Sequence, residues 1–319
     1  MDHTDVVEYV AYEYYTNDLT DFSICLKEPL ARVGSIAVPL LFSTVVLLSL
    51  VGNILVLVIL GLYENLRSLT NILILSLALS DLMFTLGLPL WSSQYIWGWT
   101  FGDAVCKGVN FVFSAGFYSS TVLLMLMTIQ CYVAVVHPLS DWERGQRFAA
   151  VPILAWVVSF GAAIPALLYS EVMGDPEDSN VVYCEFNSIH TKNQQNIFFV
   201  IAFLVVAFCY VRILQTTCRK TKRHRTERLI FWIAAVFFVG WAPYNIVIFL
   251  RTLTEHQVEP FTHCEVSTHL DYAHHVCQLL AFSHCCLKPV CYVSVRFRNH
   301  FKRVLRKMFR SQTSPASEF

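Results

Sequence analysis

The sequence predicts an all-α membrane protein, a seven-transmembrane helix bundle plus a cytoplasmic amphipathic helix. Of the 319 residues, 55% are hydrophobic and only 14% are charged, whereas about 25% of residues are charged in soluble domains. Apolar runs of about 20 residues, long enough to cross a bilayer, recur along the whole chain. The net charge is zero, but acidic and basic residues gather in different segments. These three observations together indicate an integral membrane protein with an oriented bundle.

Seven apolar runs divide the chain into predicted spans, which together occupy a bundle at 36–295. The spans cover residues 36–60, 71–91, 104–136, 150–169, 196–214, 229–250 and 270–295. An acidic, tyrosine-rich arm precedes them at 1–35. The segment "RFRNHFKRVLRKMFR" at 296–310 places apolar side chains at helical spacing among basic ones, which indicates an amphipathic helix on the membrane surface. A short tail at 311–319 is expected to be disordered.

Basic residues fix the expected orientation of the bundle. Most of the 23 Lys and Arg residues lie around Arg67, in 141–147, in 212–228 and in the tail. The positive-inside rule places these segments in the cytoplasm, and an odd number of spans then places the N-terminus outside the plasma membrane. The basic stretch at 212–228 suits an anionic lipid surface or an effector. Neither a nucleic-acid partner nor a cofactor is expected for this membrane protein.

Four cysteines fall at or near the outer ends of the predicted spans, where disulfides persist. They are Cys25, Cys106, Cys184 and Cys264. Four cysteines allow three pairings. Because a closed bundle brings the starts of the first and seventh spans together, we expect Cys25–Cys264 and Cys106–Cys184.

Several motifs identify the family that the chain resembles. "LVGNILVL", "LALSDL", "WGWTFGDAVCK", "WAPYNIV" and "AFSHCCLKPVCYV" resemble those of rhodopsin-like (class A) G-protein-coupled receptors. "SHCC", the second outer cysteine pair and the acidic arm resemble the chemokine receptor family, with "YENLRSLTNI" and "LDYA" most similar to its XC-type members and then to the CC type. The resemblance implies a chemokine ligand and a heterotrimeric G protein of the inhibitory type as partners.

The N-terminal arm is expected to capture the ligand. It carries Tyr9, Tyr12, Tyr14 and Tyr15 among acidic residues, with too little aliphatic content to fold alone. A solvated acidic tail is the plain alternative. In an outward-facing receptor, opposite electrostatic potentials would speed encounter with a small basic chemokine, and sulfation of the tyrosines would add negative charge.

Aromatic residues of the spans are expected to form the floor of the ligand site. They are Trp91, Phe113, Tyr244, Phe282 and Trp241, although a stripe of this kind also suits an ordinary core. Pro89 and Pro243 favour helices bent open toward the outside. The resemblance implies a Glu in the seventh span that meets the amino terminus of the ligand, but Gln278 stands there. Charge recognition would then fall to other acidic residues, for which the candidates are Glu185, Glu265 and Asp271.

The inner half of the predicted bundle carries two ionisable residues at membrane depth, Asp81 and Lys288. Such residues are costly and mark functional positions. In the family, the matching Asp helps to hold a sodium ion, and Ser120 matches another ligand. Lys288 replaces the Asn of the Asn-Pro-x-x-Tyr motif that ends here at Tyr292. We expect the Lys288 ammonium to pair with Asp81 in place of sodium, so no metal is expected; the alternative is a neutral lysine.

The effector face departs from the family pattern. Gln130-Cys131-Tyr132 stands where the family has Asp-Arg-Tyr, and cysteine lacks the donors with which the Arg contacts the G protein. A proline of the fifth span is replaced by Ala202, eight residues before Tyr210. The inner tyrosines Tyr210 and Tyr292 and the basic residue Arg223 are present. The tail offers arrestin few phosphorylation sites, namely Ser311, Thr313, Ser314 and Ser317.

Two receptor functions stay open at this point. One is a signalling chemokine receptor, and the other is an atypical, decoy or viral-type receptor with weak or no G-protein coupling. An engineered triplet is a further explanation for Gln130 and Cys131. A transporter or an intramembrane enzyme is disfavoured, because the sequence has no paired carboxylates at membrane depth, no mid-membrane Ser–His pair and no evident internal repeat.

Overall fold

The computed structural model describes residues 28–66, 68–137, 150–174, 182–186, 189–217, 225–259, 261 and 264–294. The predicted amphipathic helix at 296–310, Arg223, Cys25 and the tyrosines of the arm lie outside the described residues. The same holds for the side chains of Cys264, Glu265 and Glu185, whose backbone alone is described.

Long helices account for nearly all of the described chain. They are α2 (Glu28–Tyr63), α3 (Leu69–Trp97), α4 (Asp103–Val136), α5 (Ala150–Leu168), α6 (Ile189–Thr217), α7 (Arg225–Glu255) and α8 (Cys264–Phe282). Within the described residues, seven helices are long and apolar enough to cross a membrane, and the seventh runs from Val266 to Ser294. Several helices extend beyond the predicted spans, because the backbone stays helical where the apolar run gives way to polar residues.

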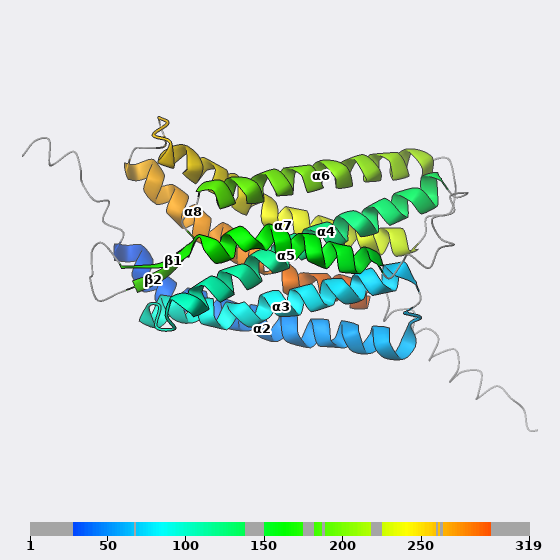
Figure 1. The fold of residues 1–319 in the computed structure, drawn as a ribbon, viewed down its shortest axis with the longest axis horizontal. Helices are drawn as coiled ribbons and strands as arrows, with labels where there is room; N and C mark the ends of the chain where they lie inside the picture. Colours follow the sequence, from blue (N-terminus) through cyan, green and yellow to red (C-terminus); the bar gives the residue numbers. More distant parts are fainter. Residues whose placement is uncertain are drawn as a thin grey trace, which may run out of the picture.

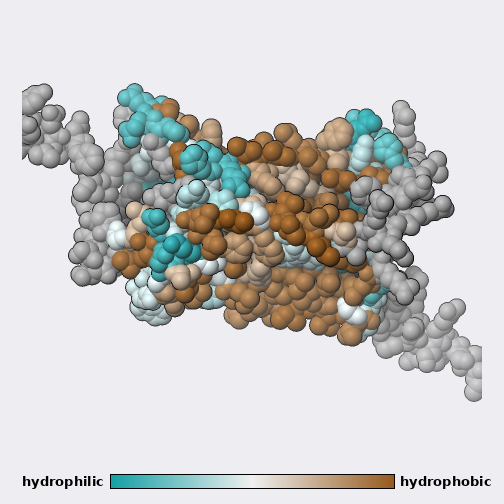
Figure 2. All heavy atoms as spheres, in the orientation of Figure 1, coloured by the Kyte–Doolittle hydropathy of each residue, from teal (hydrophilic) through white to brown (hydrophobic). Residues whose placement is uncertain are grey.

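The helices lie side by side as one elongated bundle (Figure 1). Hydrophobic side chains cover the middle of the visible face, and hydrophilic ones gather toward its two ends (Figure 2). Many of the exposed residues are large and apolar, such as Leu47, Val157 and Leu204. An exposed apolar belt of this kind is stable only in lipid, so the surface agrees with the seven-span prediction.

A β-hairpin lies at one end of the bundle, called the hairpin end below (Figure 1). Strand β1 (Ser170–Gly174) pairs antiparallel with β2 (Val182–Phe186), with Val172 opposite Cys184. The hairpin is not predicted from the sequence, because two five-residue strands in a polar connection give no alternating pattern long enough to identify. A Cys106–Cys184 disulfide ties β2 to the start of α4, which confirms that predicted pairing.

The seventh span, expected at 270–295, is interrupted by a turn. Helix α8 ends at Phe282, Ser283 is a turn, and helix resumes over 284–294. The Ser283 hydroxyl donates to the Leu280 carbonyl at 2.6 Å, and His284 Nδ1 lies 2.6 Å from the Ala281 carbonyl oxygen. The backbone bonds from the Ser283 N–H to the Leu279 carbonyl and from the Leu287 N–H to the Ser283 carbonyl persist across the turn, so these side-chain contacts add to the helical ladder there.

Candidate functional site

Four aromatic side chains from four helices meet in the half of the bundle nearer the hairpin. We call Trp91, Phe113, Tyr244 and Phe282 the aromatic cluster. The ring centroids of Phe113 and Phe282 lie 5.5 Å apart, those of Trp91 and Phe113 lie 6.0 Å apart, and those of Tyr244 and Phe282 lie 6.5 Å apart. The structure therefore brings together the residues that the sequence analysis grouped as the floor of a ligand site. Trp241 adjoins them, 5.6 Å from Tyr244 and 6.2 Å from Phe282.

Polar groups of α3 and α8 lie in the same half of the bundle as the aromatic cluster. Gln278 on α8 is buried, with 2% of its surface exposed. The Tyr95 hydroxyl lies 3.3 Å from His275 Nδ1, and the His274 ring lies 5.3 Å from the Tyr244 ring. The Trp91 indole nitrogen is buried and has no hydrogen-bond partner among the described residues.

Arg251 and Asp271 form an ion pair near the hairpin end, with Nη2 and Oδ1 3.1 Å apart. Asp271 was one of the acidic residues expected to recognise ligand charge, and its carboxylate is already engaged by this guanidinium. The side chains of the other two candidates, Glu185 and Glu265, are outside the described part of the chain.

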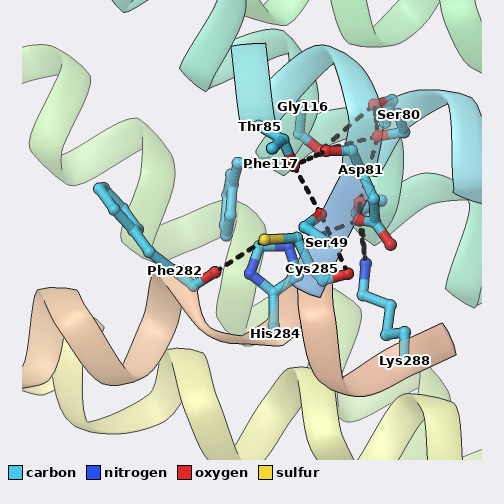
Figure 3. Close-up of polar contacts among 12 residues, drawn as sticks. Ser49, Ser80, Asp81, Thr85, Gly116, Phe117, Phe282, His284, Cys285 and Lys288 are labelled. Atoms are coloured by element: carbon cyan, nitrogen blue, oxygen red, sulfur yellow. Dashed lines mark hydrogen bonds and ion pairs between the residues drawn. The ribbon is translucent and has the colours of Figure 1, made fainter. Parts of the chain in front are cut away.

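A buried polar network occupies the middle of the bundle (Figure 3). The Lys288 ammonium donates to Asp81 Oδ1 at 2.7 Å and to the Ser120 hydroxyl at 3.2 Å, and Ser120 donates to the same Asp81 oxygen at 3.3 Å. Lys288 is 3% exposed and Asp81 is 1% exposed. The expected Lys288–Asp81 contact is therefore present, and it joins the seventh span to α3 and α4.

Two further side chains enclose this network. His284 Nε2 lies 3.7 Å from Asp81 Oδ1, beyond hydrogen-bond distance, and has no hydrogen-bond partner in the described chain. The Lys288 ammonium also lies 5.3 Å from the centroid of the Phe237 ring on α7, a cation–π distance. The ammonium therefore contacts groups of α3, α4 and α7.

These residues do not fit a sodium ion. A sodium ion would need the Asp81 and Ser120 oxygens as ligands, and the Lys288 ammonium already binds both. A second cation at that position would meet the positive charge of Lys288 at close range, which is unfavourable in a medium of low dielectric constant. The network is complete with the cation that the chain itself supplies.

Asn53 ties α2 to the turn of the seventh span. Its amide nitrogen donates to the Cys285 carbonyl at 3.0 Å and to the Ser49 carbonyl at 2.9 Å. The Ser49 hydroxyl lies 2.6 Å from the Thr85 hydroxyl of α3. These bonds satisfy a backbone carbonyl beside the turn, which would otherwise be an unpaired group in an apolar interior.

The end of the bundle opposite the hairpin holds the altered triplet. Cys131 is 8% exposed, so its thiol lies inside the bundle rather than on the surface. Glu227 at the start of α7 is within electrostatic range of both Cys131 and Tyr210. The Gln130 side-chain oxygen is buried and has no partner among the described residues. Tyr132 is partly exposed, and its hydroxyl oxygen lies 3.4 Å from His137 Nε2.

The remaining switch residues lie in helix interiors. Pro243 is inside α7, and α6 runs through Ala202 and Tyr210 without an interior proline. Tyr292 is 1% exposed. Helix α6 is continuous through Ala202.

Three partners of the site residues were not predicted from the sequence: His284, Glu227 and Arg251. His284, four residues before Lys288, was visible in the sequence, and helical spacing places it on the same face. Glu227 and Arg251 gave no such signal, because each meets its partner on a different helix.

The comparisons with known proteins agree with this architecture. Residues 52–292 match the family model described as "7 transmembrane receptor (rhodopsin family)". The seven apolar helices and this match define the class of the protein, a seven-span membrane receptor of the rhodopsin family.

Similarity to individual proteins narrows the class. The chain is 44% identical to chemokine XC receptor 1 of Homo sapiens over 293 residues, which cover 89% of the chain and 86% of that protein. It is 38% identical to chemokine XC receptor 1 of Mus musculus over 96% of the chain and 94% of that protein. It is also 34% identical to C-C chemokine receptor type 4 of Homo sapiens, over 96% of the chain and 89% of that protein. The chain belongs to the chemokine receptor family, whose members are receptors and not enzymes.

Proposed function

We propose that this receptor binds a small basic chemokine of the XC class and activates a heterotrimeric G protein of the inhibitory type. The observation that carries the proposal is the 44% identity to chemokine XC receptor 1 of Homo sapiens over 89% of the chain. A CC-class chemokine is the next candidate ligand, since the identity to C-C chemokine receptor type 4 is 34%.

The hairpin end is proposed to face the outside of the plasma membrane. The Cys106–Cys184 disulfide lies there, and disulfides persist in an oxidising compartment. The basic segments at 212–228 and 296–310 belong to the opposite, cytoplasmic end by the positive-inside rule. In this orientation the N-terminus is extracellular and the tail is available to anionic lipid and, through its few hydroxyl residues, to arrestin.

Ligand binding is proposed to use two regions. The acidic arm at 1–35, with Tyr9, Tyr12, Tyr14 and Tyr15, captures the basic body of the chemokine by electrostatic attraction. The aromatic cluster and Gln278, with Glu185 at the hairpin, then receive the end of the ligand that enters the bundle. The disulfide supports this arrangement because it holds β2 over the start of α4.

Lys288 is proposed to act as the permanent cation of the bundle. Its ammonium lies where the family resemblance places a sodium ion, 2.7 Å from Asp81 Oδ1. A cation carried on a side chain cannot leave, so the contact between the seventh span and α3 does not depend on the sodium concentration outside the cell.

A second candidate function is chemokine capture with weak or no G-protein activation. The buried position of Cys131, 8% exposed, favours it, because the thiol has neither the reach nor the donors of an arginine. Gln130 also lacks the charge of the family's acid. Both candidates share the ligand and differ only at the cytoplasmic end.

One experiment tests both candidates. Cells that express the chain are assayed for binding of radiolabelled XC-class and CC-class chemokines and, in parallel, for G-protein activation. Saturable binding of a chemokine with G-protein activation supports the signalling receptor, and binding without activation supports the capture function. Absence of binding by every chemokine, with the receptor present at the cell surface, contradicts both.

A further inference from the structure

We propose that Asn196 on α6 and Asn245 on α7 form a hydrogen bond in the chemokine-bound receptor and position the two helices in that state. The inference rests on the proposed chemokine-binding function and names two positioning residues outside the aromatic cluster. Three observations carry it: two buried polar groups without partners, the register of α6 against α7, and the link between Asn245 and the turn of α7 that holds Trp241 and Tyr244.

The side-chain amides of Asn196 and Asn245 each contain a buried group without a hydrogen-bond partner among the described residues. The unpaired group of Asn196 is the donor Nδ2, and that of Asn245 is the acceptor Oδ1. Asn245 is 4% exposed, and its own Nδ2 donates to the Trp241 carbonyl at 2.9 Å, which leaves Oδ1 as the unpaired atom of that amide. Buried polar groups without partners are costly and uncommon, so an arrangement of the helices that pairs the two amides would relieve both costs.

Helical register places the two amides on facing surfaces of α6 and α7. The centroid of the Phe238 ring on α7 lies 5.5 Å from that of Phe199 and 5.6 Å from that of Phe203, both on α6. Two turns of an α-helix take about seven residues and return a side chain to nearly the same face. Two turns toward the hairpin end lead from Phe203 to Asn196 on α6. The same step leads from Phe238 to Asn245 on α7, because the two helices run in opposite directions. The donor and the acceptor therefore lie at matching levels of the α6–α7 interface, although they are not hydrogen-bonded to each other in this structure.

Asn245 connects this interface to the aromatic cluster. It follows Tyr244, a member of the cluster, in the sequence. Its amide is bonded to the carbonyl of Trp241, whose ring centroid lies 5.6 Å from that of Tyr244. A ligand that displaces the cluster rings therefore also moves the turn of α7 that carries Asn245. A shift of this turn toward α6 would pair Asn245 Oδ1 with Asn196 Nδ2, so chemokine binding and the new hydrogen bond favour the same arrangement.

Opposite effects on the free and the bound receptor test the inference. Asn196→Leu replaces the amide by an apolar group of similar size. It removes an unpaired polar group from the free receptor, but one partner of the hydrogen bond from the bound receptor. We expect Asn196→Leu to raise the midpoint of thermal unfolding without chemokine by about 2 °C. The same variant is expected to weaken the affinity for a radiolabelled XC-class chemokine by about fivefold, the size of one neutral hydrogen bond.

A double-mutant cycle assigns the effect on affinity to the pair. Asn245→Leu is also expected to weaken chemokine affinity by about fivefold. The double variant Asn196→Leu/Asn245→Leu is expected to weaken it by about fivefold, rather than by the roughly 25-fold product of independent effects. Gln194→Leu is the matched control, because Gln194 lies on the same turn of α6 but its amide already donates to the Ala162 carbonyl at 3.0 Å. It is expected to lower the midpoint of thermal unfolding and to leave chemokine affinity unchanged.

Three results overturn the inference alone. The first is an Asn196→Leu receptor whose chemokine affinity is unchanged or higher. The second is a double variant that is weakened by the full product of the single effects. The third is an Asn196→Leu receptor with both a lower midpoint and a weaker affinity, which would give Asn196 a structural role in the free receptor. Absence of chemokine binding by the unmodified receptor, when it is present at the cell surface, instead contradicts the proposed function, and the inference fails with it.

Discussion

The Lys288 ammonium lies 2.7 Å from Asp81 Oδ1 in the interior of the bundle, where both residues are almost fully buried. The pair joins the part of the seventh span beyond the Ser283 turn to the middle of α3, and Ser120 brings α4 into the same contact. Figure 3 shows the lysine side chain directed toward the carboxylate. The positive charge that neutralises Asp81 is therefore supplied by a side chain of the protein itself, Lys288.

The first prediction concerns the loss of this charge. Lys288→Met keeps an unbranched side chain that is one atom shorter and removes the ammonium, which leaves Asp81 buried without its partner. Breaking a buried pair in this way costs about 3–5 kcal/mol. We expect a lower midpoint of thermal unfolding for the purified receptor in lipid nanodiscs, followed by the fluorescence of a thiol-independent dye.

The double variant Asp81→Asn/Lys288→Met is the control for that prediction. It removes both charges, so most of the lost stability is expected to return, because the buried carboxylate no longer needs a counter-ion. A double variant as unstable as Lys288→Met alone would mean that packing, and not the charge pair, holds the seventh span to α3.

The second prediction concerns sodium. Because the ammonium occupies the oxygens of Asp81 and Ser120, replacing sodium chloride by choline chloride at equal ionic strength is expected to leave chemokine affinity and thermal stability unchanged. Lys288→Asn, which restores the residue of the family motif, is expected to gain a stabilisation by sodium. Saturable sodium dependence of the unmodified receptor would contradict the role given to Lys288.

Much of the fold could be predicted from the sequence because membrane spans obey strong rules. Each span must bury its backbone polar groups in a helix and its side chains in lipid or protein, so apolar length alone located all seven. The Cys106–Cys184 disulfide could be predicted because the cysteines belong to the same end of the bundle. The Lys288–Asp81 contact could be predicted because a buried charge in the membrane requires a partner and the family resemblance places Lys288 across from Asp81.

Other features were beyond the reach of sequence patterns. The Ser283 turn is a local irregularity with side-chain contacts that span only a few residues, and it leaves the apolar run of the seventh span intact. The Arg251–Asp271 pair depends on the relative rotation of α7 and α8, which no periodicity of one helix encodes. The burial of Cys131 likewise follows from the way α4 packs against its neighbours.

The third prediction concerns the cytoplasmic end. Cys131→Arg restores the arginine of the family triplet, but Glu227 at the start of α7 lies near Cys131, so the new guanidinium is expected to pair with its carboxylate. We expect Cys131→Arg alone to increase chemokine-stimulated G-protein activation only weakly, because the ion pair would hold the arginine. Cys131→Arg/Glu227→Gln is expected to increase activation further, measured as nucleotide exchange on an inhibitory-type G protein.

Glu227→Gln by itself is the matched control and is expected to leave activation at the level of the unmodified receptor. G-protein activation is compared among variants at equal amounts of bound chemokine, so that differences in receptor expression do not affect the comparison. If the single and double arginine variants activate equally, Glu227 does not restrain the arginine; if neither activates, the third-span arginine is not what limits coupling.

The fourth prediction uses two glycines in different surroundings. A Cβ atom at Gly52 on α2 would lie 2.8 Å from the Pro289 Cβ, whereas a Cβ at Gly161 on α5 would meet nothing within 4 Å. Alanine is otherwise the better helix residue by about 1 kcal/mol. We therefore expect Gly161→Ala to raise the midpoint of thermal unfolding. Gly52→Ala is expected to lower the midpoint, because overpacking reduces the free energy of unfolding by about 1–3 kcal/mol.

Since Pro289 follows Lys288, Gly52→Ala is also expected to displace the ammonium from Asp81 and to create sodium dependence that Gly161→Ala lacks. Equal stabilisation by both alanines would show that α2 does not press against the seventh span at this point.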